Sequence, residues 1–375
     1  MDLKNKDNLN NPEIFQRSRF KEKSSGHIWF LIITILFSLT VFVFFRSDER
    51  NIPFFSAKQE KTVAFERNNN LEGAENSNKN DNYAKGGTGK DIFFEGKMPN
   101  SQFQPVRKEN SGDLVLPNAH ASLILDADSG TILHYNNGKE RRQIASLTKL
   151  MTAVLVMEKI ANLDEEVVIG EEVYIEGTKV GCPRSGYCIG QRLQVGEKIS
   201  VRSLLMAMLM NSANDAATAL GKHISGSIEN FSKLMNERAK ELGFNDSHFC
   251  TPSGLEIDGR ESECYSTAYD IARIAAHSMK YDVIWDIMRL SPQTIYSIDG
   301  KLAHDIMNTD QVLDQIPNCL GGKTGFTPLA GSSLLMGASD STGKHKIVAV
   351  LLDDPYRWQD IKTMIDWTFD SCEWK

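Results

Sequence analysis

The chain has 375 residues, of which 24% are charged and 41% hydrophobic, and its formal net charge is −7. The acidic balance argues against a nucleic-acid partner, because phosphate binding requires a basic face and the sequence contains no basic stripe with interleaved aromatic residues. The length leaves room for about two average domains, and the hydrophobic content is compatible with a globular core.

An uncharged apolar run occupies residues 28–45. A helix of this length rises about 1.5 Å per residue to roughly 27 Å, close to the hydrocarbon thickness of a bilayer. A modest excess of basic residues before the run favours a cytoplasmic N-terminus. The alternative is a cleaved signal peptide, whose apolar region usually has about 7–15 residues and precedes a small-x-small cleavage site. We expect an uncleaved, single-pass anchor in the cell (inner) membrane, with residues 1–27 cytoplasmic and the remainder extracytoplasmic or periplasmic.

Residues 46–115 form the next region and are rich in Asn, Lys, Glu, Gly and Ser. Such a segment cannot bury enough apolar area to offset the entropy lost on ordering. We therefore expect a disordered linker, which as a flexible coil has a mean reach of roughly 45 Å. The linker connects the predicted anchor to a folded domain at residues 116–375.

Regular elements begin at about residue 118. Residues 121–130 predict a strand that runs into an Asp-Ser-Gly turn, and residues 131–138 predict a second strand closed by Asn-Asn-Gly, a strong hairpin signal. Apolar periodicity and N-terminal residues such as Ser146 predict helices at 146–160, 201–210, 228–243 and 265–279.

The C-terminal part returns to strand patterns. Apolar runs at 329–339 and 345–353 are typical of adjacent strands, and residues 360–372 predict a closing helix. Because strands come first and last with helices between them, we expect one α/β domain whose sheet pairs both ends of this region and carries an inserted helical lobe.

The chain has six cysteines, all beyond the predicted anchor: Cys182, Cys188, Cys250, Cys264, Cys319 and Cys372. An even number on the exported side favours disulfides. Cys182 and Cys188 bracket a short Pro/Gly loop and are the easiest local pair, and Cys250 with Cys264 is the next. The sequence alone does not fix the connectivity, and reduced, buried cysteines are the alternative. Because no CxxC or HExxH pattern is present, we expect no metal, and no organic cofactor is implied.

Three short motifs stand out in chain order: Ser146-Leu147-Thr148-Lys149, Ser212-Ala213-Asn214 and Lys323-Thr324-Gly325. In a helix, positions i and i+3 share a face, so the Ser146 hydroxyl and the Lys149 amine can meet. A serine hydroxyl is a weak nucleophile that needs a base, and a lysine is a base only where burial and a nearby positive charge lower its pKa. Lys323 is the candidate for that second cation.

Two backbone N–H groups are candidates for an oxyanion hole. One is the N–H of Ser146 at the start of a helix, where the helix dipole favours negative charge, and the other is the N–H of Phe326 after the third motif. Each motif alone also occurs by chance in helix ends and turns. Their order, and their placement at the edges of predicted elements, distinguish this set from a chance occurrence of three unrelated motifs.

The set resembles that of the low-molecular-mass penicillin-binding proteins, the D-alanyl-D-alanine carboxypeptidase family of serine peptidases. The resemblance extends to the segments 122–137, 144–155, 211–220, 249–259, 265–275 and 321–335. It implies a β-lactamase/transpeptidase-like α/β (α+β) fold, in which helices cover a mainly antiparallel sheet and a helical lobe is inserted. One transmembrane helix would precede that fold.

The resemblance also implies roles for the first two motifs. Ser146 resembles the acylated nucleophile and Lys149 its general base. Ser212 resembles the serine that relays a proton to the leaving D-alanine, and Asn214 the group that orients Lys149 and the substrate amide. The expected reaction removes the terminal D-alanine from peptidoglycan stem pentapeptides through an acyl-enzyme, and β-lactam antibiotics are expected to act as covalent inhibitors.

In the third motif, Lys323 and Thr324 resemble the groups that bind the terminal carboxylate of the substrate. Gly325 lets the substrate backbone lie close to the strand. Some relatives carry an arginine near the position of Thr309, and none stands there in this sequence. Many relatives also continue into a β-rich domain and a C-terminal anchor. We expect the N-terminal helix to replace that anchor.

Three alternatives remain beside the carboxypeptidase. A D,D-endopeptidase of the same family would use the same chemistry on crosslinked peptides. A class A β-lactamase would need a glutamate in an E-x-x-L-N context, whereas the nearest match, residues 241–245, sits in a helix end, and Ala213 replaces the usual aspartate. A non-catalytic wall-binding protein would have no use for the intact motifs.

Overall fold

A computed structural model of the chain describes residues 103–184 and 186–375, which belong to the compact unit Asp81–Lys375. The predicted cytoplasmic tail, the predicted anchor and most of the predicted linker lie outside the described residues. Within 103–184 and 186–375, no helix has both the length and the apolar character needed to cross a bilayer.

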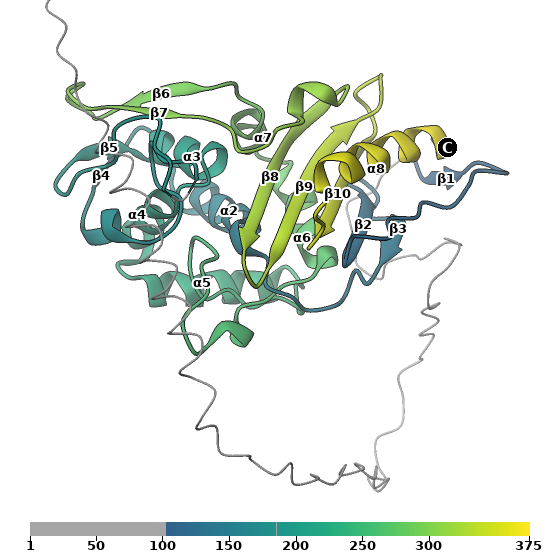
Figure 1. Cartoon of the computed structure of the whole chain (residues 1–375), viewed down its shortest axis with the longest axis horizontal. Coiled ribbons are helices and arrows are strands. Elements are labelled where there is room, and N and C mark those ends of the chain that lie inside the picture. The colour runs from purple at the N-terminus through teal and green to yellow at the C-terminus, as the bar shows by residue number, and fades with distance from the viewer. Residues whose placement is uncertain (1–102, 185) are drawn as a thin grey trace, which may run out of the picture. The chain divides into compact units, whose positions relative to one another are not determined.

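A five-stranded antiparallel sheet forms the centre of the domain, in the order β3-β2-β10-β9-β8 (Figure 1). Its strands are β2 (Ala121–Asp126), β3 (Ile132–Asn136), β8 (Cys319–Thr327), β9 (Gly331–Ser339) and β10 (Lys346–Leu352). β2 pairs with β10, with Ile124 opposite Ala349, so strands from both ends of the domain lie side by side as the sequence predicted. β8 is an edge strand, and its outer edge faces the helical lobe (Figure 1).

Both faces of the sheet are buried. Alternate side chains of each strand point to opposite sides, so each strand contributes to two cores. In β10, Val348 and Val350 join the core shared with α6 (Ala268–Ser278) and the lobe, whereas Ala349 and Leu351 join the core beneath α8 (Arg357–Ser371). Figure 1 shows α8 lying across β9 and β10. This confirms the expected sheet with helices on both faces.

The helical lobe is inserted between β3 and β8 and contains α2 (Lys149–Lys159), α3 (Val201–Met210), α4 (Asn214–Ser225), α5 (Ile228–Glu241) and α7 (Asp282–Met288). The helix α3 begins after Ser200, whose hydroxyl accepts a hydrogen bond from Ser203 N–H. In α5, Phe231, Met235 and Ala239 recur at intervals of four residues and form its buried face.

Three short two-stranded sheets and four 3-10 turns complete the described part of the chain. The sheets pair β1 (Pro105–Arg107) with β11 (Cys372–Trp374), β4 (Glu166–Val168) with β5 (Lys198–Ser200), and β6 (Gln293–Tyr296) with β7 (Ala303–Ile306). The turns are η1 (Ala145–Thr148), η2 (Glu171–Tyr174), η3 (Glu261–Glu263) and η4 (Leu313–Gln315). β1 falls within the range predicted as linker, and its pairing with β11 ties these residues to the domain.

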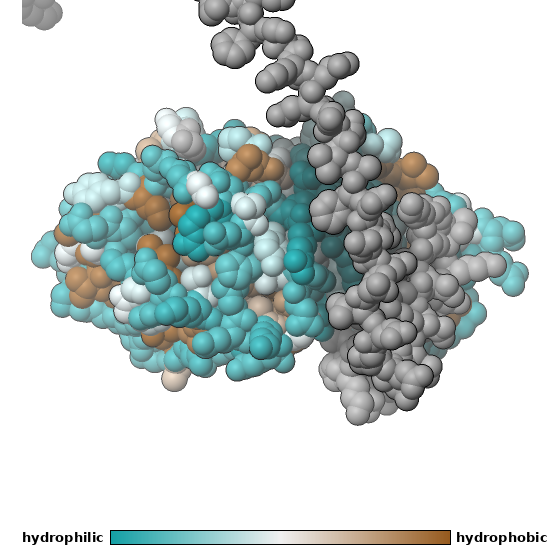
Figure 2. Space-filling view, turned by 90° about the horizontal axis from the view of Figure 1, so that it is seen from below, coloured by the Kyte–Doolittle hydropathy of each residue, from teal (hydrophilic) through white to brown (hydrophobic). Residues whose placement is uncertain are grey.

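The surface visible in Figure 2 is mostly hydrophilic apart from the grey atoms, with hydrophobic residues in small separate patches. Single exposed apolar residues are normal on folded domains and carry no functional signal by themselves.

Candidate active site

The first motif sits on a 3-10 turn and not on the first turn of an α-helix. Ser146 lies in η1, and α2 begins only at Lys149. Ser146 therefore does not cap the helix in the way that the sequence suggested. Side chains at i and i+3 nearly eclipse each other in a 3-10 turn, and Lys149 Nζ lies 2.8 Å from Ser146 Oγ. Ala145, just before the nucleophile candidate, holds a left-handed backbone with φ 47°.

The amine of Lys149 is buried, with no solvent exposure, and is surrounded by oxygen atoms. It lies 2.7 Å from Asn214 Oδ1 and 2.7 Å from the Ser253 carbonyl, in addition to Ser146 Oγ. A carbonyl oxygen accepts hydrogen bonds and cannot donate. In the neutral amine, the two N–H groups satisfy Asn214 and Ser253, so the lone pair faces the Ser146 hydroxyl.

The electrostatic surroundings favour this neutral form of Lys149. Burial lowers the pKa of Lys149 well below its ordinary value, the nearby charge of Lys323 lowers it further, and the carboxylate of Asp215 opposes them. Asp215 accepts hydrogen bonds from the backbone N–H groups of Val180 and Ala216. Lys149 is thus a candidate general base, a buried amine with a lowered pKa in contact with the candidate nucleophile.

Asn214 begins α4 and has its amide orientation fixed by the segment 176–178. Its Nδ2 donates to the Glu176 carbonyl at 2.9 Å, which leaves Oδ1 to face Lys149. Its backbone N–H donates to the Thr178 carbonyl at 2.8 Å. Gly177 permits this approach, because its φ is 80° and an added Cβ would lie 2.6 Å from Asn214 Nδ2.

The second and third motifs meet through their side chains. Lys323 Nζ, on β8, lies 2.9 Å from Ser212 Oγ and also donates to the Thr324 carbonyl. Burial lowers the pKa of Lys323 to about 7, an effect that the charge of Asp310 opposes and that of Arg357 reinforces. Ser212 has a left-handed backbone, with φ 57°. Because the Ser212 hydroxyl contacts a lysine whose pKa is about 7, it is a candidate for proton transfer within the site.

The rest of the third motif lines the edge of β8. Thr324 Oγ1 lies 2.7 Å from Thr309 Oγ1. A side chain at Gly325 would collide with the Ile144 carbonyl, which its Cβ would approach to 2.8 Å. The ring of Phe326 is exposed. The Arg357 guanidinium donates to the Gly325 carbonyl at 2.9 Å, so an arginine reaches β8 from α8 although none stands beside Thr309.

The sequence did not identify Ser253, Asp215 or Arg357 as parts of this site. Ser253 acts through its backbone carbonyl, which a residue of any type could supply, so its identity carries no signal. Asp215 follows Asn214 directly and stands in the first turn of α4, where an acidic residue is common whatever its function. Arg357 lies far from the third motif along the chain and in no recognisable pattern.

The structure forms two disulfides, Cys182–Cys188 and Cys250–Cys264, which are the two pairs that proximity along the chain favoured. Cys319 and Cys372 are free thiols. In the part of the chain that the structure describes, no three His, Cys, Asp or Glu side chains gather in a way that could hold a metal ion.

Comparison with known proteins agrees with this constellation. The family model for D-alanyl-D-alanine carboxypeptidase (peptidase S11) matches residues 110–355. The chain belongs to this family. D-alanyl-D-alanine carboxypeptidase DacF of Bacillus subtilis (strain 168) is 30% identical over 263 residues, which cover 68% of this chain and 63% of that protein.

Two further proteins are similar to this chain. A D-alanyl-D-alanine endopeptidase of Escherichia coli (strain K12) is 29% identical over 244 residues, which cover 63% of this chain and 71% of that protein. The crystal structure of the Streptomyces K15 DD-transpeptidase is 25% identical with a TM-score of 0.62, and the match covers 69% of this chain and 100% of that one. The chain spans a little less than two thirds of the length of the Bacillus subtilis relative.

Proposed function

We propose that this protein is a serine-type D-alanyl-D-alanine carboxypeptidase that removes the terminal D-alanine from peptidoglycan stem pentapeptides. The observation that carries the proposal is the contact of Ser146 Oγ with a fully buried lysine amine, 2.8 Å away, whose pKa is lowered. A solvated lysine in the same place would be protonated and could not accept the serine proton. Membership of the D-alanyl-D-alanine carboxypeptidase family supports the substrate class.

Acylation follows from this geometry. Lys149 takes the proton of Ser146 as Oγ attacks the carbonyl carbon of the penultimate D-alanine. The backbone N–H groups of Ser146 and Phe326 are the proposed donors to the oxyanion of the tetrahedral intermediate. The intermediate collapses to an ester on Ser146 as the C–N bond breaks, and Ser212, in contact with Lys323, relays to the leaving amine the proton that Lys149 had taken from Ser146, which returns Lys149 to the free amine.

Deacylation completes the cycle. Water replaces the departed D-alanine and attacks the ester carbonyl, with Lys149 again accepting a proton. The ester C–O bond breaks, the shortened peptide leaves with a free carboxylate, and Ser146 recovers its proton. A β-lactam enters the same acylation step, but its leaving nitrogen remains tethered to the acyl group and obstructs the water. β-Lactams are therefore expected to trap the enzyme on Ser146.

Substrate recognition is proposed to use β8 in two ways. The charge of Lys323 and the hydroxyl of Thr324 would bind the terminal carboxylate, and Gly325 would let the peptide backbone approach the strand. β8 is an edge strand, so its outer edge offers backbone groups to an extended peptide.

A D,D-endopeptidase is the second candidate, favoured by the similarity to the Escherichia coli endopeptidase. The chemistry is the same in both, and only the residues that border the site decide whether a crosslinked peptide fits. Digestion of purified crosslinked muropeptides in parallel with free pentapeptides separates the two. Release of D-alanine from pentapeptides with crosslinks left intact supports the carboxypeptidase.

We also propose that residues 28–45 anchor the protein in the cell membrane, with the catalytic domain outside the cytoplasm. The apolar length of that run and the basic residues before it support this location. Disulfides within the domain are also typical of an oxidising compartment. Accessibility of the domain to protease added to spheroplasts, compared with lysed cells, tests the topology.

The central test is labelling with a fluorescent penicillin. Wild-type protein should form a covalent adduct on the peptide that contains Ser146, located by mass spectrometry, and should release D-alanine from a pentapeptide. Ser146→Ala should lose both activities, whereas the matched control Ser341→Ala alters an exposed serine and should retain both. Labelling that persists in Ser146→Ala would refute the assignment of the nucleophile.

A further inference from the structure

The disulfide Cys250–Cys264 closes a segment that lies against the candidate general base. We call residues 250–264 the disulfide loop. Its first half is directed into the site: the Ser253 carbonyl lies 2.7 Å from Lys149 Nζ, and the Pro252 carbonyl accepts a hydrogen bond from Thr152 Oγ1, also at 2.7 Å. Both partners belong to α2, so the backbone of this loop fixes the side of the helix that carries the base.

The fit between the loop and η1 is close. Gly254 has φ 81°, and an added Cβ would lie 2.0 Å from the Ala145 carbonyl and 2.7 Å from Thr148 Oγ1. The loop backbone thus lies in direct contact with the turn that bears Ser146. A second contact joins the loop to the end of β8, where Thr327 Oγ1 donates to Glu256 Oε1.

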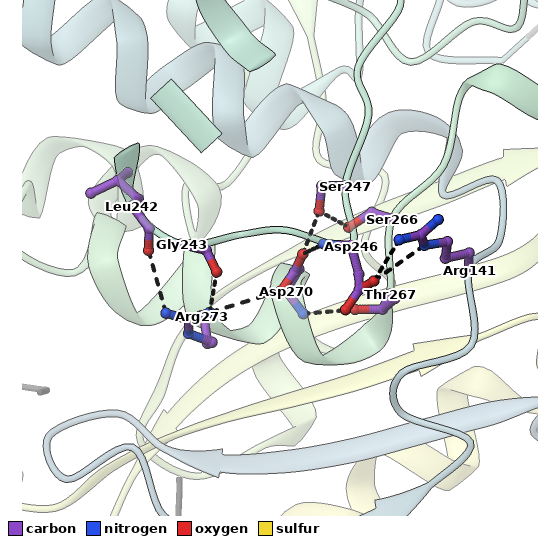
Figure 3. Close-up of polar contacts among 9 residues, drawn as sticks. All are labelled: Arg141, Leu242, Gly243, Asp246, Ser247, Ser266, Thr267, Asp270 and Arg273. Carbon is purple, nitrogen blue, oxygen red and sulfur yellow. Dashed lines mark hydrogen bonds and ion pairs between the residues drawn. The ribbon is translucent and has the colours of Figure 1, made fainter. Parts of the chain in front are cut away.

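The base of the loop is held independently of the disulfide, by the polar network in Figure 3. Asp270 accepts hydrogen bonds from the Asp246 N–H and the Ser247 hydroxyl, each at 2.9 Å. Arg141 pairs with Asp246 at 2.8 Å. His248 and Tyr265 exchange both backbone hydrogen bonds just outside the two cysteines. These contacts at the foot of the loop should survive loss of the disulfide.

The second half of the loop, in contrast, is mostly exposed, and its backbone is held by hydrogen bonds of the Glu261 carbonyl with Gln143 and of the Glu263 carbonyl with His248. Residues 258–260 and 262–263 are exposed, and none of residues 254–264 is buried. The covalent link from Cys264 to Cys250 closes the loop next to Phe249, whose backbone is hydrogen-bonded to Asn236 on α5, and it joins the exposed half of the loop to the half that carries the Ser253 carbonyl. Opening the link would give the loop conformational freedom next to Lys149.

We propose that the Cys250–Cys264 disulfide is a positioning element for the general base: it holds the Ser253 carbonyl on Lys149 and keeps water from the amine. The inference rests on the proposed acylation chemistry. The charged groups that face Lys149 are Lys323 on β8 and Asp215 on α4, and neither belongs to the loop. Loosening the loop changes the hydration of the amine and leaves these charges in place.

The test compares single-turnover acylation by a fluorescent penicillin in wild type, Cys250→Ala/Cys264→Ala and the control Cys319→Ala, which removes a free thiol outside the loop. The double variant should acylate about 100-fold more slowly, the scale of a misplacement of about 1 Å in an active site. Hydration would raise the pKa of Lys149 toward its ordinary value, so the acidic limb of the pH–rate profile should move to higher pH. Cys319→Ala should match wild type in both respects.

Reduction provides a second measurement without a change at the loop. In Cys182→Ala/Cys188→Ala, Cys250–Cys264 is the disulfide that remains among the described residues. Treatment of this protein with a phosphine should slow acylation and shift the pH profile in the same way, and reoxidation should restore both. Thermal unfolding in each state shows whether the domain remains folded.

Several outcomes would overturn the inference. One is a folded, disulfide-free loop with wild-type rate and pH profile, and another is a uniform loss of rate with an unchanged profile. Unfolding of both the double variant and the reduced protein would make the disulfide a stabilising crosslink only. Failure of wild-type protein to react with penicillin or to release D-alanine would instead refute the proposed function itself, so the two failures are distinguishable.

Discussion

Gly254→Ala provides a sharp test of how the site is assembled. Two penalties act on the substitution. A left-handed backbone costs an L-residue about 1–2 kcal/mol, and the new Cβ would lie 2.0 Å from the Ala145 carbonyl. Ordinary contact begins at 3.4 Å, so the two atoms must separate by 1.4 Å, which is 3.4 minus 2.0. Either the Ser146 turn or the Ser253 carbonyl has to move.

A displacement of this size predicts a loss of about 100-fold in acylation, because reacting groups misplaced by about 1 Å lose roughly that factor. Gly259→Ala is the matched control. Gly259 belongs to the same loop and has φ 76°, but an added Cβ would meet no atom within 4 Å. The control should therefore lose the same 1–2 kcal/mol of stability, approximately, with an acylation rate close to wild type.

The assay is stopped-flow acylation by a chromogenic cephalosporin, with unfolding free energies from urea titrations of all three proteins. A Gly254→Ala protein that is folded and acylates as fast as Gly259→Ala would refute the reasoning. That result would mean that the Ser253 carbonyl and the Ser146 turn can separate without consequence for the base.

Two further predictions concern buried charges. Since the pKa of Lys323 is lowered to about 7, the free enzyme carries this charge below that pH and loses it above, so kcat/KM for pentapeptides should fall as pH rises through about 7. A C-terminally amidated peptide, which lacks the carboxylate, should show no such fall, and an identical fall would contradict the assigned role. His304 contacts Glu197 at 2.7 Å, with both side chains almost fully buried. Burial alone would lower the pKa of His304, but the hydrogen bonds to Glu197 and to a backbone carbonyl raise it, so the pair stabilises the fold fully below about pH 6.5 and less as pH rises through the folded-state pKa. His304→Ala should lower the unfolding free energy at pH 6 by about 3–5 kcal/mol, whereas Lys301→Ala, which breaks the exposed pair with Asp299, should leave it close to the wild-type value in the same urea titration. Equal losses in the two variants would contradict the pairing argument.

The elements with a strong local pattern could be predicted from the sequence. The helix predicted at 201–210 matches α3, and the paired strands at the two ends of the domain follow from apolar runs that are buried on both faces. The pattern was insufficient where a tertiary contact overrides it. β1 lies in a polar region that no local signal marks as a strand, and it forms because β11 supplies the hydrogen bonds.

The candidate site could likewise be predicted only in part. The three motifs fixed the residue types, and the i to i+3 spacing placed Ser146 beside Lys149. The turn type at Ser146 could not be predicted, because it depends on the left-handed backbone at Ala145, an L-residue for which no propensity rule expects that conformation. The contribution of Ser253 was hidden for a different reason, since a backbone carbonyl is independent of side-chain identity.

The two buried lysines explain why the three motifs have to meet. Burial disfavours the charged form of both lysines, and the charge of Lys323 further disfavours that of Lys149, so the site favours a state in which at most one of the two is charged. Under the proposed function, the bound carboxylate of a substrate would stabilise the protonated form of Lys323, while Lys149 faces fixed carbonyl acceptors and a hydroxyl. In that proposal, substrate binding would separate the protonation states of two residues of the same type: a cation that holds the carboxylate, and a free amine that accepts the proton of Ser146.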